Sequence, residues 1–259
     1  MAAGRSRRRL LRHRLLRWLG VAALVLVILP VLPVLALRWV HPWTSAYMLG
    51  TRVDALLAHD FRFSNDYRWR DLEDISPHAA IAMIASEDQQ FAFHAGFDFK
   101  SIREALRSNA HGYRVRGAST ITQQVAKNLF LWKGRSYFRK GLEAWFTVLI
   151  EWLWPKERTL EIYLNIAQFG RSIWGVEAAA QNFYHKSAHR LTRRESAMLS
   201  AVLPNPVIYK VEAPSRTVLA HRDWTLAQMR ALGGQAYLDQ LDANDDADPE
   251  ARSQDAFKR

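Results

Sequence analysis

The chain has 259 residues, no cysteine and a formal net charge of +11. The lack of cysteine excludes disulfides, zinc–thiolate sites and catalytic thiols. Seven arginines in residues 1–17 supply +7 of the charge and leave only +4 for the remainder, a distribution that indicates a basic tail. We therefore expect no nucleic-acid partner.

The twenty residues 18–37, which follow the basic tail, carry no charge. A helix of that length spans roughly 30 Å, the thickness of a bilayer core. We predict a cytoplasmic tail over 1–17 and a single transmembrane helix over 18–40, with the remainder outside the membrane because the arginines precede the helix. A cleaved signal peptide is the alternative, although the apolar run is long for one and no clear small-x-small cleavage site follows.

Beyond the apolar run, residues 41–77 read as a connecting segment, and residues 78–241 as a mostly α-helical domain with few strand-like runs. We expect helices near 78–93, 99–110, 119–130, 137–154, 157–168, 175–185, 193–203 and 216–240. Thr192 and Glu195 predict a capping box, and Gly233-Gly234 should interrupt the last helix. The polar residues 242–259 are predicted to be disordered.

An acidic pair, Glu87-Asp88, lies inside an apolar helical stretch. Burial of a carboxylate raises its pKa, which suits a general acid or base. If the helix continues to residue 93, Glu87, Phe91 and His94 share one face. The alternative is an amphipathic helix whose two acids point to water.

Residues 116–128 form a polar cluster in which hydroxyl and amide side chains follow Gly117. Ser119 and Thr120 offer capping hydroxyls, and Gln124 and Lys127 are three residues apart on one helical face. A helix start with hydroxyls, amides and a lysine is a plausible cradle for a phosphate or a sugar, although many solvated helix starts look similar.

A third cluster comprises Arg135, Arg139, Lys140 and Glu143. One interpretation is a surface helix with salt bridges worth ~0.3–0.5 kcal/mol each. The other is a site for an anionic leaving group, with or without a divalent cation. Two further segments are read first as packing: residues 156–165, and residues 146–154, which could alternatively insert partly into a membrane surface.

Taken in order, these patterns resemble the peptidoglycan glycosyltransferases of family 51. The matching segments are 87–96 (Glu-Asp-x-x-Phe-x-x-His-x-Gly), 117–128 (Gly-x-Ser-Thr-Ile-Thr-Gln-Gln-x-x-Lys-Asn), 139–143 (Arg-Lys-x-x-Glu), 161–165 (Glu-x-Tyr-Leu-Asn) and 194–206. Each motif alone is weak, but five in this order are specific. The Ser-x-x-Lys and Lys-Thr-Gly strings of a transpeptidase do not occur. The chain therefore resembles the stand-alone, monofunctional biosynthetic transglycosylases.

The resemblance implies a lysozyme-like multi-helix domain that polymerises lipid II into glycan strands, with inversion and release of undecaprenyl diphosphate. Glu87 matches the catalytic base, with Asp88 and His94 as support. Glu143 would organise the diphosphate site, alone or by holding Mg²⁺ or Mn²⁺. The implied substrate-binding residues are Ser119, Thr120, Gln124, Lys127, Asn128, Arg135 and Lys140.

The implied setting is the bacterial inner membrane, with the catalytic domain in the periplasm and other cell-wall synthesis proteins as partners. Two other functions stay open. A lysozyme-like lytic enzyme would also use a lone glutamate, but it would not need cations for a lipid diphosphate. A non-catalytic membrane scaffold would not need the acidic pair.

Overall fold

The computed structural model describes residues 14, 17, 18, 20, 21, 24, 25, 27–110, 119–134 and 136–245. Most of the basic tail, Gly117, Arg135 and residues 246–259 lie outside these residues, so the predictions made for them are untested. The chain divides into two compact units, Met1–Val40 and His41–Arg259. The first contains helix α2 (Val31–Ala36). Among the residues described, no helix is both long enough and apolar enough to cross a membrane.

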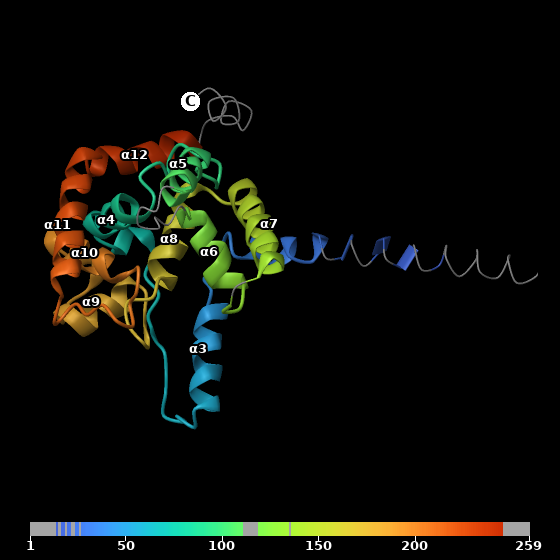
Figure 1. Cartoon of the computed structure of the whole chain (residues 1–259), viewed down its shortest axis with the longest axis horizontal. Coiled ribbons are helices and arrows are strands. Elements are labelled where there is room, and N and C mark those ends of the chain that lie inside the picture. The colour runs from blue at the N-terminus through green and yellow to red at the C-terminus, as the bar shows by residue number, and fades with distance from the viewer. Residues whose placement is uncertain are drawn as a thin grey trace, which may run out of the picture. The chain divides into compact units, whose positions relative to one another are not determined.

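The second unit is mostly helical, as predicted (Figure 1). Whether it is lysozyme-like stays a prediction. Its elements in chain order are α3 (Ala46–Leu57), β1 (Asp66–Tyr67), η1 (Leu72–Asp74), α4 (Pro77–Glu87), α5 (Phe99–Ala110), α6 (Ile121–Phe130), α7 (Tyr137–Leu153), α8 (Lys156–Ile166), β2 (Ile173–Trp174), α9 (Val176–Tyr184), η2 (Ala188–Arg190), α10 (Arg193–Val202), α11 (Arg216–Ala231) and α12 (Gln235–Asp245).

Most predicted helices agree with these bounds to within two residues, because capping residues at their ends act locally. Helix α3 was not predicted, since residues 41–77 were expected only to connect, and α12 extends to Asp245, into residues expected to be disordered. Thr192 and Glu195 form the expected capping box at the start of α10. Gly233 and Gly234 separate α11 from α12, and both have positive φ angles, of 89° and 63°. Such angles are readily adopted only by glycine, so the interruption follows from the sequence.

The prediction of a helix over 78–93 is wrong at its C-terminal end. Helix α4 stops at Glu87, and Asp88 has a non-helical backbone with φ −158° and ψ 76°. Glu87, Phe91 and His94 therefore do not share a helical face. The physical reason is tertiary: the Asp88 carboxylate accepts hydrogen bonds from the backbone N–H of Ile121 and from His94, which a continued helix would not allow.

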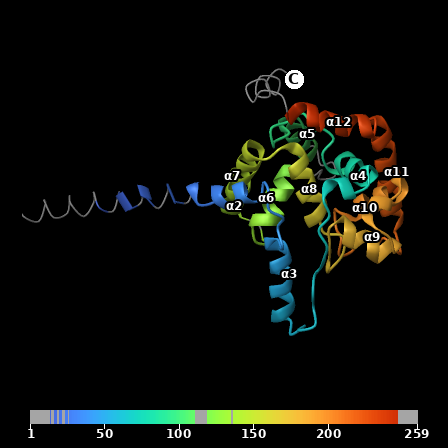
Figure 2. The same ribbon diagram turned by 180° about the vertical axis from the view of Figure 1, so that it is seen from behind.

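Helix α4 is the centre of the core. Its residues from Ala79 to Ala85 are all buried. It packs against α8, α10, α11 and α12, and the two views in Figures 1 and 2 show it enclosed by these helices. A helix covered on all sides is apolar all round, which explains the absence of a polar stripe before Glu87. The base candidate thus lies at the end of the best-buried helix.

Helix α7 contains residues 146–153 of the apolar stretch 146–154, which was expected either to pack in the core or to insert into a membrane surface. Phe146, Leu149 and Ile150 are buried, whereas Val148 and Trp152 are 47% and 78% exposed. One face of this helix therefore belongs to the core, where it packs against α6. The other face presents apolar side chains to the exterior.

Candidate functional site

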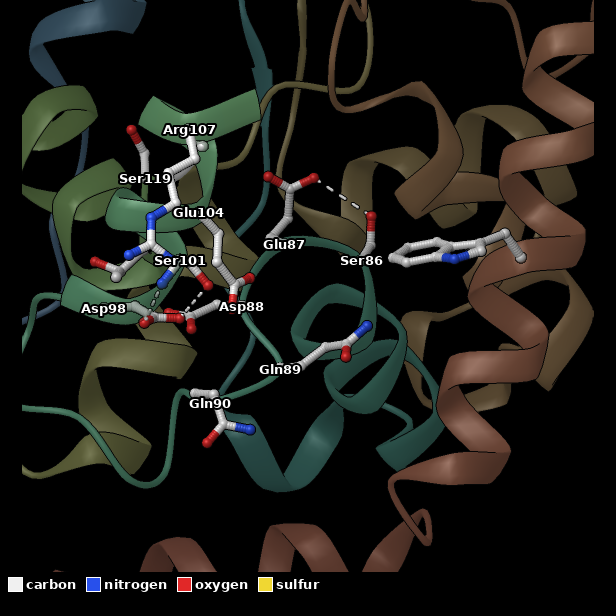
Figure 3. Close-up of a pocket in the computed structure, with 13 residues that line it drawn as sticks. Ser86, Glu87, Asp88, Gln89, Gln90, Asp98, Ser101, Glu104, Arg107 and Ser119 are labelled. Carbon is white, nitrogen blue, oxygen red and sulfur yellow. Dashed lines mark hydrogen bonds between the residues drawn. The ribbon is translucent and has the colours of Figure 1, made fainter. Parts of the chain in front are cut away.

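Glu87 is the last residue of α4, and its carboxylate is held by two side chains. Gln124 Nε2 on α6 donates a hydrogen bond of 2.8 Å to Glu87 Oε2. Ser86 Oγ donates one of 3.4 Å to Glu87 Oε1 (Figure 3). Burial raises the pKa of Glu87 above its ordinary value, and the Gln124 hydrogen bond partly opposes that rise. A carboxylate with a raised pKa is suited to accept a proton.

Tyr163 on α8 fixes the orientation of the Gln124 amide. Its buried hydroxyl donates to Gln124 Oε1 over 3.4 Å, which leaves Gln124 Nε2 directed at Glu87. Sequence reasoning had assigned the segment around Tyr163 to packing and missed this contact. The sequence did hold a clue to this contact: Tyr163 stands at an apolar position of its helix, and a buried tyrosine hydroxyl needs a hydrogen-bond partner.

Asp88 and His94, to which the resemblance gave a supporting role, contact each other next to Glu87. Asp88 is 6% exposed and accepts the Ile121 N–H over 2.9 Å. His94 Nε2 lies 2.9 Å from both oxygens of Asp88, and His94 Nδ1 accepts the Gly96 N–H over 3.1 Å. Because Nδ1 is an acceptor, the ring proton is on Nε2 and is donated to Asp88. This ties the residues after Glu87 to the start of α6.

The polar residues predicted in and just before α6 are of two kinds: Thr120 caps the helix, whereas Ser119 and Asn128 have side chains that are at least partly exposed. Thr120 is the N-cap: its hydroxyl accepts the Gln123 N–H and donates to Gly96 O, so it is fully engaged. Ser119 is exposed and borders the cavity described below. Asn128 is half-buried one turn beyond Gln124, on the same side of the helix.

A group of charges lies farther along α6 and on α7. Glu143 is buried and pairs with Lys140 and with Arg139, whose Nη1 lies 3.6 Å from Glu143 Oε2. Lys127 Nζ lies 5.9 Å from the centre of the Tyr47 ring. Burial lowers the pKa of Lys127, while Glu143 and Glu87 both act to raise it. The charge of Lys127 is therefore coupled to both Glu87 and Glu143.

Two members of this group, Arg139 and Tyr47, are not among the substrate-binding residues that the resemblance implied. Arg139 is 9% exposed, and its Nε and Nη1 atoms have no hydrogen-bond partner. Tyr47 comes from α3, in the segment expected only to connect. Burial raises the pKa of Tyr47, and Arg139 and Glu143 act on it in opposite directions, so its phenol lies near both. Arg139 belongs to the third cluster, for which a surface ion pair and a site for an anionic leaving group were both considered.

The donor set around Glu143 does not suit a divalent cation held by the protein. Its carboxylate already has two cationic partners, which would repel a metal ion. In the part of the chain that the structure describes, the group of metal-ligand side chains found close together is His41, Asp71 and Glu161, which does not include Glu143.

A cavity of about 550 Å³ opens beside Glu87. Figure 3 shows Ser86 and Glu87 at the end of α4, with Ser101, Glu104 and Arg107 of α5 on the other side of the opening. Most of the lining is polar, and Trp224 of α11 supplies an aromatic wall. Neither Lys127 nor Glu143 lines it. The carboxylate of Glu87 is thus accessible to a hydroxyl-rich ligand, and the cationic group lies apart from this cavity.

Comparison with known proteins gives consistent matches. The sequence profile of the family described as transglycosylase matches residues 55–230. A biosynthetic peptidoglycan transglycosylase of Xanthomonas oryzae pv. oryzae (strain KACC10331 / KXO85) is 52% identical over 227 residues, 88% of this chain and 93% of the relative. A relative of the same name from Xylella fastidiosa (strain 9a5c) is 48% identical over 223 residues, covering 86% of this chain and 92% of its own length.

Proposed function

This chain belongs to the transglycosylase family, and on that premise we propose that it polymerises lipid II into peptidoglycan glycan strands, with Glu87 as general base. The observation that carries the proposal is the position of Glu87. A carboxylate with a raised pKa, oriented by Gln124, stands at a polar cavity large enough for sugar rings.

The proposed reaction places the acceptor sugar in the cavity. Its 4-hydroxyl attacks the anomeric carbon of the donor strand from the side opposite the leaving group, so the configuration inverts. The hydroxyl proton passes to Glu87 as the new bond forms, since a neutral hydroxyl is a weak nucleophile. The bond to the undecaprenyl diphosphate breaks, and its electrons remain on the diphosphate.

The diphosphate gains charge as it leaves, and cations already in position stabilise it. We assign this role to Lys127, Lys140 and Arg139. The Nε–H of Arg139, which has no hydrogen-bond partner, would bind a phosphate oxygen. Arg135 is proposed for the same group from its place in the sequence. Ser119, Gln124 and Asn128 would position the donor sugar or phosphate, and Thr120 would maintain the start of α6.

Glu143 is proposed to organise these cations. A Mg²⁺ or Mn²⁺ ion, if the reaction uses one, would be held mainly by the diphosphate oxygens, because the Glu143 carboxylate is neutralised by Lys140 and Arg139. Such an ion would add positive charge at the leaving group.

A polyprenyl substrate stays in the bilayer, and we propose that this enzyme works at the inner-membrane surface. The uncharged residues 18–37 would anchor it within a span over 18–40, with the arginine-rich N-terminus in the cytoplasm and the catalytic unit in the periplasm. The exposed Trp152 of α7 and Leu57 of α3 would contact lipid. Other cell-wall synthesis proteins would meet it there.

The test offers purified wild-type protein lipid II in one reaction and preformed peptidoglycan in another. We expect glycan strands from lipid II and no breakdown of the polymer. Glu87→Gln, which keeps the shape and removes the base, should reduce polymerisation roughly 10²- to 10⁴-fold. Glu73→Gln, at an exposed carboxylate outside the site, is the control and should be fully active.

Breakdown of peptidoglycan without consumption of lipid II would assign the protein to the lytic class instead. No activity on either substrate, with a folded protein, would favour a scaffold. The orientation has its own test: a periplasmic reporter fused after Arg259 should be active, and an inactive one would reverse the proposed topology.

A further inference from the structure

The segment from Asp88 to Gly96 joins the base to the rest of the site, and it has no helix or strand of its own. Contacts from other elements hold its shape. Ile121 N and His94 bind Asp88, Lys156 Nζ binds His94 O at 2.7 Å, and the Thr120 hydroxyl binds Gly96 O. These contacts hold the two ends of the segment, and the middle is held by the C-terminal helices.

Tyr237 on α12 binds the middle of this segment twice. Its hydroxyl donates to Gln89 O and accepts the Ala92 N–H, each over 3.1 Å. Tyr237 is 3% exposed, and its ring meets Phe93 edge-on at 5.8 Å. One phenol oxygen therefore bridges a carbonyl and an amide three residues apart, across a turn that begins two residues after Glu87.

A second tie comes from α11. The Gln89 side chain donates from Nε2 to Gln228 Oε1 over 3.2 Å and to Ala85 O of α4 over 3.1 Å. Gln89 thus connects the last turn of α4, which carries Glu87, to α11. Both C-terminal helices therefore contact the same turn: α12 binds the backbone of the turn, and α11 binds the side chain of Gln89.

We propose that Tyr237 is a positioning residue for the catalytic base, acting through the turn at 89–92. The inference rests on the function proposed above and extends it to a helix beyond residue 230, where the match to the family profile ends. Ala92 is buried, so its N–H needs a partner inside the protein. Removal of the hydroxyl deletes both of its hydrogen bonds to the turn, the one to Gln89 O and the one from the Ala92 N–H, so the turn is held less firmly. Glu87, two residues before the turn, then loses its alignment with Gln124.

The test compares Tyr237→Phe with Tyr67→Phe in the full-length protein. Tyr67 is a matched control, since its hydroxyl also bonds a backbone carbonyl, Pro42 O at 2.6 Å, but does not touch the segment at 88–96. Both changes remove one hydroxyl and keep the ring. The measurements are the unfolding temperature, kcat and KM for lipid II, and the pH dependence of kcat/KM.

We expect Tyr237→Phe to lower kcat roughly 10- to 100-fold with little change in KM, because a small misplacement of a reacting group has effects of that size. The acidic limb of its pH profile should move to higher pH, because Glu87 loses the hydrogen bond that lowers its pKa. Tyr67→Phe should alter stability comparably and keep the wild-type kcat and profile. Gln228→Leu should shift the profile in the same direction with a smaller loss.

Equal kcat and equal pH profiles for Tyr237→Phe and Tyr67→Phe, with Gln228→Leu also unchanged, would overturn the inference and leave the proposed function intact. A wild-type protein that does not polymerise lipid II would overturn the proposed function, and the inference with it. A fall in kcat for Tyr237→Phe without a pH shift would show that the turn acts on something other than Glu87.

Discussion

Gln124→Leu tests whether the amide tunes the base. The 2.8 Å hydrogen bond from Gln124 Nε2 stabilises the charged form of Glu87. A hydrogen bond to a charged group is worth about 1.5–3 kcal/mol. Since about 1.4 kcal/mol is a factor of ten, its loss should lower the ionisation constant of Glu87 roughly 10- to 100-fold. The pKa of Glu87, already raised by burial, should rise further.

The assay is kcat/KM for lipid II as a function of pH. The base acts only when deprotonated, so activity falls as the pH drops through its pKa. The deficit of Gln124→Leu should therefore be largest on the acidic side, at roughly 10- to 100-fold, and should shrink as the pH rises. Unfolding is followed in parallel, because Leu leaves the Tyr163 hydroxyl without its partner.

Gln181→Leu is the matched control. Gln181 Nε2 donates to the buried carboxylate of Glu177 over 3.0 Å, the same chemistry away from the cavity. It should affect stability and leave the pH profile unchanged. A deficit in Gln124→Leu that is the same at every pH would refute the reasoning and assign Gln124 to substrate contact alone. A profile shifted equally in both variants would also refute it.

Two further predictions concern the cations and the backbone. Lys127→Met should lower kcat/KM at least roughly 10²-fold, because it removes a donor that stabilises the charge of the leaving group. The control is Lys133→Met, which removes only an exposed ion pair with Asp54 and should be near wild type in the same assay. Gly96→Ala should destabilise the fold by about 1–3 kcal/mol in thermal unfolding, because φ is +80° and a Cβ would lie 2.7 Å from Glu151 Cγ. Gly141→Ala, in a helix with open space around it, should instead be neutral or stabilising, and a loss of stability there would contradict the argument.

Local patterns in the sequence were enough to predict most of the helices after residue 77 and the cap at Thr192, but not α3, which lies in the segment expected only to connect. A capping box such as Thr192 to Glu195 lies within one helical turn, and the break at Gly233-Gly234 depends only on the backbone freedom of glycine. The charge pattern and apolar periodicity likewise act over a few residues, so each could be read without knowing the fold.

Tertiary structure alone decided how the base is held. Helix α4 ends at Glu87 because Asp88 bonds to Ile121, 33 residues away. Gln124 reaches Glu87 across 37 residues, and Tyr237 reaches Ala92 across 145. Buried polar groups must find partners wherever the fold brings them. The sequence by itself therefore indicated the candidate residues, while packing around α4 determined which of them touch.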